Sequence, residues 1–102
     1  MFLVQLLLPL YDNAGHRFDN ARFGEVMDEL TDRYGGVTAY MRSPARGEWR
    51  EGSGTVEKDE VVMFEVMVDH LDRAWWTRYR TALERRFGQD ELVVRATAME
   101  RL

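Results

Sequence analysis

The sequence predicts one α+β domain, residues 1 to 102, with elements in the order β-α-β-β-α-β. Three observations lead to this prediction. The length of 102 residues fits one domain. The apolar residues recur with a period of two in four segments and with a period of about 3.6 in two others. The apolar content of 45% is enough for a core that needs no disulfides or metal.

The first strand and the first helix are predicted from residues 2 to 34. Residues 2 to 8 form a strand that is apolar on both faces, as expected of a central strand. After a loop rich in turn-forming residues, residues 19 to 34 have the pattern of an amphipathic helix. Asp19 is a suitable N-cap, and Gly35 or Gly36 supplies the left-handed residue that commonly ends a helix.

Three more strands are predicted at residues 37 to 42, 61 to 68 and 92 to 99. The second of these has the strongest pattern in the chain, with an apolar residue at almost every position. The segment from 43 to 54 connects two of the strands. It predicts a short strand extension at residues 48 to 50 and a turn at residues 52 to 54.

The second helix is predicted at about residues 70 to 87. Asp69 is its expected N-cap, because Asp72 follows three residues later as in a capping box. Helical spacing puts Trp75 on the inner stripe and Trp76 at its edge, where Trp76 could line a cleft or contact an arginine. The expected inner residues are Leu71, Trp75, Tyr79, Ala82 and Leu83, with Phe87 also at the edge.

This element order is that of the ferredoxin-like fold. Right-handed crossovers put both helices on one face of an antiparallel sheet with strand order 4-1-3-2. The first and third strands are then central, in agreement with their apolar character. The first helix is mainly acidic and the second is rich in arginine, so we expect the two helices to attract each other at their rims.

The sheet face without helices is too apolar to be fully exposed to water, which predicts a homodimer packed sheet to sheet. Gln5, Glu65 and Arg95 form a polar cluster near the middle of this face, close to Tyr40. One interpretation is that Glu65 and Arg95 form an ion pair that fixes the register of the dimer. The other is a polar pocket in which Glu65 acts as a general base. The ion pair is the favoured interpretation.

Composition and motifs exclude several kinds of function. There is no cysteine, which excludes disulfides, thiolate metal sites and a cysteine nucleophile. The net charge of −4 argues against nucleic-acid binding. The apolar start "MFLVQLLLPL" has no preceding basic residue and is too short for a membrane span, so a cytoplasmic location is expected. No phosphate-binding loop or metal-binding motif occurs, and we predict no cofactor and no metal.

Four residues form a candidate pocket: Tyr40, Trp49, His70 and Trp76. Trp49 is a large aromatic in a polar connection, so it needs something to pack on, such as an open end of the core, a dimer partner or the roof of a pocket. His70 beside Asp69 could bind metal or move protons. An exposed histidine at the start of a helix is the favoured interpretation, because no second metal ligand lies at a suitable spacing.

The segments "GGVTAY", "GEWREGSG" and "VVMFEVMVD" resemble a family of small bacterial proteins of unknown function that have a G-x-T…G-x-W…G core. The resemblance covers roughly residues 30 to 70 and implies a ferredoxin-like or dimeric α+β-barrel fold. Barrels of this kind include small monooxygenases, isomerases and dehydratases, which often bind aromatic or apolar substrates between sheet and helices. No catalytic signature of these enzymes is found in this chain.

Two functions remain. The favoured one is a homodimer that binds a small molecule or a partner without catalysis. The alternative is a cofactor-independent enzyme, similar to a monooxygenase or isomerase, that acts on a small apolar or aromatic substrate. Its pocket would lie between the sheet and the helices.

Overall fold

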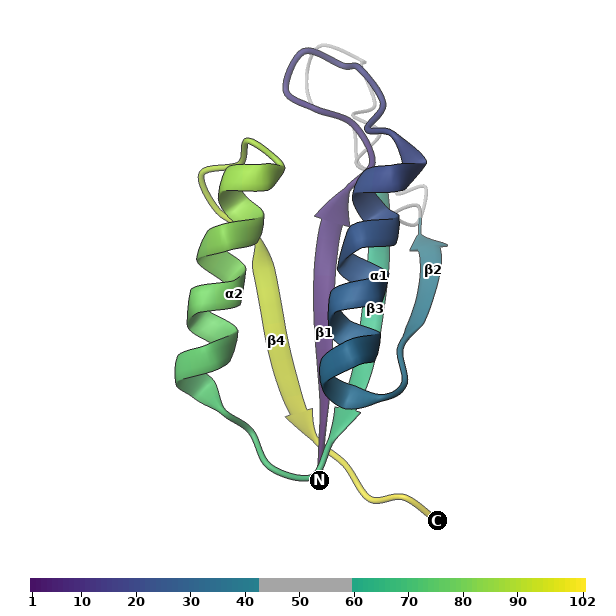
Figure 1. Cartoon of the computed structure of the whole chain (residues 1–102), viewed down its shortest axis with the longest axis vertical. Helices are drawn as coiled ribbons and strands as arrows, with labels where there is room; N and C mark the ends of the chain where they lie inside the picture. The colour runs from purple at the N-terminus through teal and green to yellow at the C-terminus, as the bar shows by residue number, and fades with distance from the viewer. Residues whose placement is uncertain (43–59) are drawn as a thin grey trace, which may run out of the picture.

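A computed structural model of the chain describes residues 1–42 and 60–102. It has four antiparallel strands in one sheet and two helices (Figure 1). The elements are β1 (Phe2–Pro9), α1 (Asn20–Tyr34), β2 (Thr38–Arg42), β3 (Val61–Val68), α2 (Arg73–Arg86) and β4 (Val93–Ala98). The strand order β2-β3-β1-β4 is the predicted order 4-1-3-2 read from the other edge, which confirms the ferredoxin-like fold. The predicted features at residues 48 to 54 lie outside the described residues.

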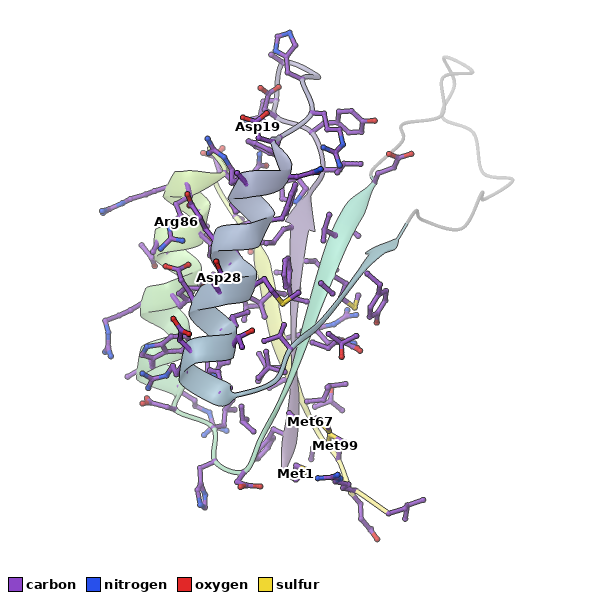
Figure 2. All side chains as sticks on the ribbon, turned by 45° about the vertical axis from the view of Figure 1, so that its right-hand side comes forward. Met1, Asp19, Asp28, Met67, Arg86 and Met99 are labelled. Carbon is purple, nitrogen blue, oxygen red and sulfur yellow. The ribbon has the colours of Figure 1, made fainter. Side chains whose placement is uncertain are left out.

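Both helices cover the same face of the sheet, as Figures 1 and 2 show. On this face β1 presents Val4, Leu6 and Leu8, each no more than 1% exposed. Their cross-strand neighbours on β3 are buried as well, because alternate residues of a strand point to the same face. Burial of each large aliphatic or aromatic side chain contributes about 1.5–3 kcal/mol. Other fully buried side chains of this core are Phe64, Val66, Val26, Leu30, Leu83 and Phe87.

The ends of α1 lie where the sequence predicts them. Asp19 is the N-cap residue by backbone conformation, although its side chain makes no capping hydrogen bond. Gly35 follows the last turn with φ of 79°, a left-handed conformation that strongly favours glycine. Its N–H donates to the carbonyl of Thr31 and so satisfies one of the free carbonyls at the helix end.

The start of α2 and its inner face differ from the prediction. The helix begins at Arg73, and the N-cap is Asp72, whose Oδ1 accepts the N–H of Trp75 at 3.1 Å. Asp69 lies in an exposed turn before it. Trp76 is buried at 5% exposure, whereas Trp75 is only half-buried. The sequence-based prediction of Trp75 as the inner tryptophan and Trp76 as the edge residue is therefore wrong.

Contacts with α1 and the spacing of the buried residues explain why Trp76 is the inner tryptophan. The ring of Trp76 stacks on Tyr34, with centroids 5.3 Å apart and planes 6° apart. Trp75 lies at the interface between the helices, where the guanidinium of Arg33 is 4.2 Å from its ring centroid. A cation–π contact at such a partly exposed site contributes about 0.5–1 kcal/mol. The buried stripe of α2 runs through Trp76, Tyr79 and Leu83 to Phe87 with spacings of three, four and four residues, so helical periodicity supports Trp76 as the inner tryptophan.

We predict that Asp72→Ala lowers the free energy of unfolding by about 1 kcal/mol, because the N–H of Trp75 loses its acceptor. For a chain of this size that is a fall of roughly 4–8 °C in melting temperature, measurable by calorimetry. Asp72→Asn should retain most of the stability, since an amide oxygen also caps. Asp69→Ala is the matched control, and a loss equal to that of Asp72→Ala would contradict the assignment of the cap.

Candidate functional site

The sheet face opposite the helices, called the open face below, is rich in exposed apolar side chains. Tyr40, Met67 and Val93 are 37%, 52% and 49% exposed on it. Figure 2 shows Met1, Met67 and Met99 at the same end of the sheet. Methionine side chains adapt to differently shaped partners, so they are common on binding surfaces. The described part of the open face is therefore suited to contact with another apolar surface.

A row of polar residues crosses the middle of the open face. Gln5 on β1 is directly opposite Glu65 on β3 and Arg95 on β4. The Nε2 of Gln5 donates to Oε2 of Glu65 at 2.6 Å, and Oε1 of Gln5 accepts from Nε of Arg95 at 2.8 Å. This set of three residues is called the polar row below. Sequence alternation correctly brings the three together, and within the chain they pair through Gln5.

Within the described chain, Glu65 and Arg95 form no direct ion pair, and the expected pair between two copies stays a prediction. β1 lies between β3 and β4, so two residues in the same row of these flanking strands are about 10 Å apart. The Gln5 amide bridges that distance by donating to one side and accepting from the other. Each side chain also retains hydrogen-bonding groups that face away from the sheet.

A groove lies on the other side of the sheet, between α2 and β4. Its volume is about 320 Å³. It exists because β4 presents small side chains beneath the helix, such as Ala96, which do not fill the space under α2. The groove is lined by Val4, Leu71, Arg73, Trp76, Thr77, Arg80, Val94, Arg95 and Ala96.

The polar groups of the groove come mainly from α2. Arg73, Thr77 and Arg80 are spaced by four and three residues, so they share one side of the helix. Two buried N–H groups here have no hydrogen-bond partner among the described residues, namely Trp76 Nε1 and Arg80 Nε. The closest carboxylate oxygen to Arg80 Nε, on Glu84, is 4.0 Å away and accepts the N–H of Leu92 at 3.0 Å. A buried donor without an acceptor costs about 1–3 kcal/mol, so such atoms are uncommon.

The described residues of the sequence-predicted pocket, Tyr40, His70 and Trp76, do not come together. Tyr40 lies on the open face, where its hydroxyl donates to the sulfur of Met63 at 3.1 Å. Trp76 lies beneath α2 on the opposite side of the sheet, and His70 is exposed in the turn before that helix. Trp49 lies outside the described residues. Of the described three, Trp76 alone lines the α2–β4 groove.

The sequence contains a signal for the α2 side of the groove. Arg73, Trp76, Thr77 and Arg80 follow helical spacing on one side of α2, with two cations beside an aromatic ring. Of these four residues, the sequence-based prediction includes only Trp76, as a residue that could line a cleft. The residues of β4 that face this side of α2 cannot be predicted from the sequence, because local periodicity does not give the distance between a helix and an edge strand.

A third polar cluster joins the two helices. Arg86 on α2 donates from Nη1 and Nη2 to the two carboxylate oxygens of Glu29 on α1, at 2.5 and 2.8 Å. Tyr79 donates its hydroxyl to the same carboxylate at 3.0 Å. These bonds confirm the predicted attraction between an acidic and a basic helix. Figure 2 shows Arg86 on the side of α2 that faces α1.

The cluster shifts the pKa of each of its members for a clear physical reason. The hydrogen bonds from Arg86 lower the pKa of Glu29 below its ordinary value of 4.5, because they stabilise the carboxylate. Burial, together with the negative charge of Glu29, raises the pKa of Tyr79 above its ordinary value of 10. The hydrogen bond to Glu29 raises the pKa of Arg86. All three shifts favour the protonation states that the hydrogen bonds need, namely a charged Glu29, a charged Arg86 and a protonated Tyr79 hydroxyl, which indicates a structural role.

Within residues 1–42 and 60–102, no group of three or more histidine, aspartate or glutamate side chains could hold a metal ion. None of the helices in the same part of the chain is long and apolar enough to span a membrane.

Comparison with known proteins relates this chain to others by fold alone. No family model matches, and no curated protein matches. One similar solved structure is a phage SAM lyase in complex with S-methyl-5'-thioadenosine, with a TM-score of 0.59 and 14% identity over 94% of this chain and 79% of that one. Another is CutA1 from Pyrococcus horikoshii, with a TM-score of 0.52 and 16% identity over 100% of this chain and 86% of that one. Both similarities support the α+β fold, and the resemblance at residues 30 to 70 stays a prediction.

We predict that Glu29→Gln lowers the free energy of unfolding by about 1 kcal/mol at pH 7, after allowance for a carboxylate that is 41% exposed. Because the pKa of Glu29 is lowered on folding, the charged cluster stabilises the fold above pH 4.5, and this contribution is lost as the pH falls through the folded-state pKa. Urea unfolding at pH 7 and near pH 2.5 should show a difference between variant and wild type at pH 7 only. Asp28→Asn, one residue earlier on α1, is the control, and a difference that persists at low pH would contradict the role of the charge.

Proposed function

We propose that the chain is a small homodimeric binding module and that the open face is the surface through which two copies associate. One observation carries this proposal: apolar side chains, among them Met67 and Val93, are about half exposed on a sheet face that the chain's own helices do not cover. Exposed apolar side chains on an uncovered sheet face, here on both sides of the polar row, often mark an association surface. A second copy of the same face is apolar in the same places and would cover it.

The polar row favours a second copy over an unrelated partner, because the row is complementary to itself. A two-fold axis parallel to β1, above Gln5, exchanges the β3 side of one face with the β4 side of the other. Glu65 of each copy then faces the partner subunit's Arg95. An axis across the strands would instead place Glu65 opposite the same residue of the partner, which is repulsive. The favoured arrangement therefore contains two ion pairs between copies.

A binding role fits better than catalysis, because the residues proposed for an enzyme pocket lie on different sides of the sheet. A nucleic acid is a poor partner for a chain with a net charge of −4. The proposal includes a cytoplasmic location, since the chain has no cysteine and therefore no disulfide that would require an oxidising compartment.

Sedimentation velocity tests the proposal. At about 10 µM, a typical concentration for detecting micromolar association, we expect a species of about twice the chain mass of 12.0 kDa. Met67→Asp places a charge on the apolar face and should produce monomers. A wild-type chain that sediments as a monomer, or as any assembly other than a dimer, would sink the proposal.

Charge reversal tests the orientation of the two copies. Glu65→Arg and Arg95→Glu each bring like charges together and should weaken association at least tenfold, because such contacts cost several kcal/mol. The double variant exchanges the charges and should regain most of the affinity. Arg78→Glu, on the exposed side of α2, is the matched control. If the double variant associates no better than the single ones, the proposed axis is wrong.

A further inference from the structure

We propose that the groove between α2 and β4 binds a small organic anion with an apolar or aromatic body. In this arrangement Arg73 and Arg80 contact the anionic group, and the body lies against Trp76 and Val94. The groove is on the helix side of the sheet and the open face is on the other. The proposal therefore goes beyond self-association and stands independently of it.

The charge of the groove points to an anion. Arg73 and Arg80 both line it and both come from one side of α2. The Arg80 side chain is 44% exposed, so its guanidinium can contact a molecule in the groove while Nε remains buried. Its acidic neighbour Glu84 already accepts the backbone N–H of Leu92. No carboxylate lines the groove, although the carboxylate of Glu84 lies 4.0 Å from Arg80 Nε and offsets part of its charge.

The unpartnered donors provide a second, independent observation. Trp76 is only 5% exposed, yet Nε1 of its indole has no acceptor among the described residues. Nε of Arg80, one turn later on the same side of the helix, also has none. Both side chains line the groove, and Trp76 also belongs to the hydrophobic core. The two donor atoms are themselves buried, so an acceptor oxygen of a ligand would satisfy them only after a shift of the side chains.

The size and the lining restrict the class of ligand. A volume of about 320 Å³ is near the lower end of small-molecule sites, which span about 300–1,000 Å³. The apolar lining from Val4, Leu71 and Val94 would gain little from an inorganic ion but would bury an aromatic or aliphatic body. A carboxylate and a phosphate monoester share the required chemistry, and the experiment separates them.

The indole N–H signals of the ¹⁵N-labelled full chain give a direct readout. The chain has three tryptophans, and Trp76→Phe identifies the signal of Trp76 by its loss. If that variant does not fold, Trp49→Phe and Trp75→Phe assign the other two signals and identify the Trp76 signal by elimination. Benzoate and phenyl phosphate are titrated separately. Benzylamine and inorganic phosphate are the controls, one with the wrong charge and one without the apolar body.

We expect benzoate or phenyl phosphate to shift the Trp76 signal in a saturable way, and the tighter of the two identifies the anionic group. Arg80→Gln and Arg73→Gln should each weaken binding at least fivefold, whereas Arg80→Lys should retain part of the affinity and Arg78→Gln, on the exposed side of α2, all of it. Circular dichroism checks that each variant is folded. The proposal is overturned if neither anion moves the Trp76 signal, or if benzylamine or inorganic phosphate binds as tightly as the aromatic anions. It is also overturned if Arg78→Gln weakens binding as much as Arg80→Gln.

Discussion

The central strand β1 is the element on which the rest of the structure depends. It pairs along its length with β3 on one side and with β4 on the other. Its even-numbered residues Val4, Leu6 and Leu8 are buried beneath the helices, and Gln5 lies between them on the opposite face. One strand therefore supplies the centre of the core and the centre of the polar row. A shift of one residue in its register would exchange the two faces and lose both.

The parts of this structure that the sequence predicts are those set by local periodicity. Alternation over residues 61 to 68 defines which side chains share a face, and the element order defines which strands are neighbours. Together they place Gln5, Glu65 and Arg95 in one row. They also place β1 between β3 and β4, but they do not specify how the side chains of one row pair, and the bridge made by the Gln5 amide is seen only in the structure.

The parts that it does not predict depend on contacts between distant elements. Asp69 and Asp72 are both acceptable caps, and only the path of the chain from β3 to α2 selects Asp72. Trp75 and Trp76 are neighbours of similar character, and Trp76, on the buried stripe of α2, is the one that stacks on Tyr34. The α2–β4 groove is a gap between a helix and an edge strand, so no pattern within either element contains it.

The register of β1 also has a consequence for the order in which the chain can fold. Gln5 is 60 residues from Glu65 and 90 from Arg95, yet it bonds to both. The pairing of β1 is therefore complete only after β3 and β4, both far along the sequence, have been made. Sheets built from such long-range pairs close slowly, because the loop entropy is lost before the pairing compensates for it. A chain interrupted before β4 would leave one edge of β1 open, with its backbone groups free to pair with another incomplete chain.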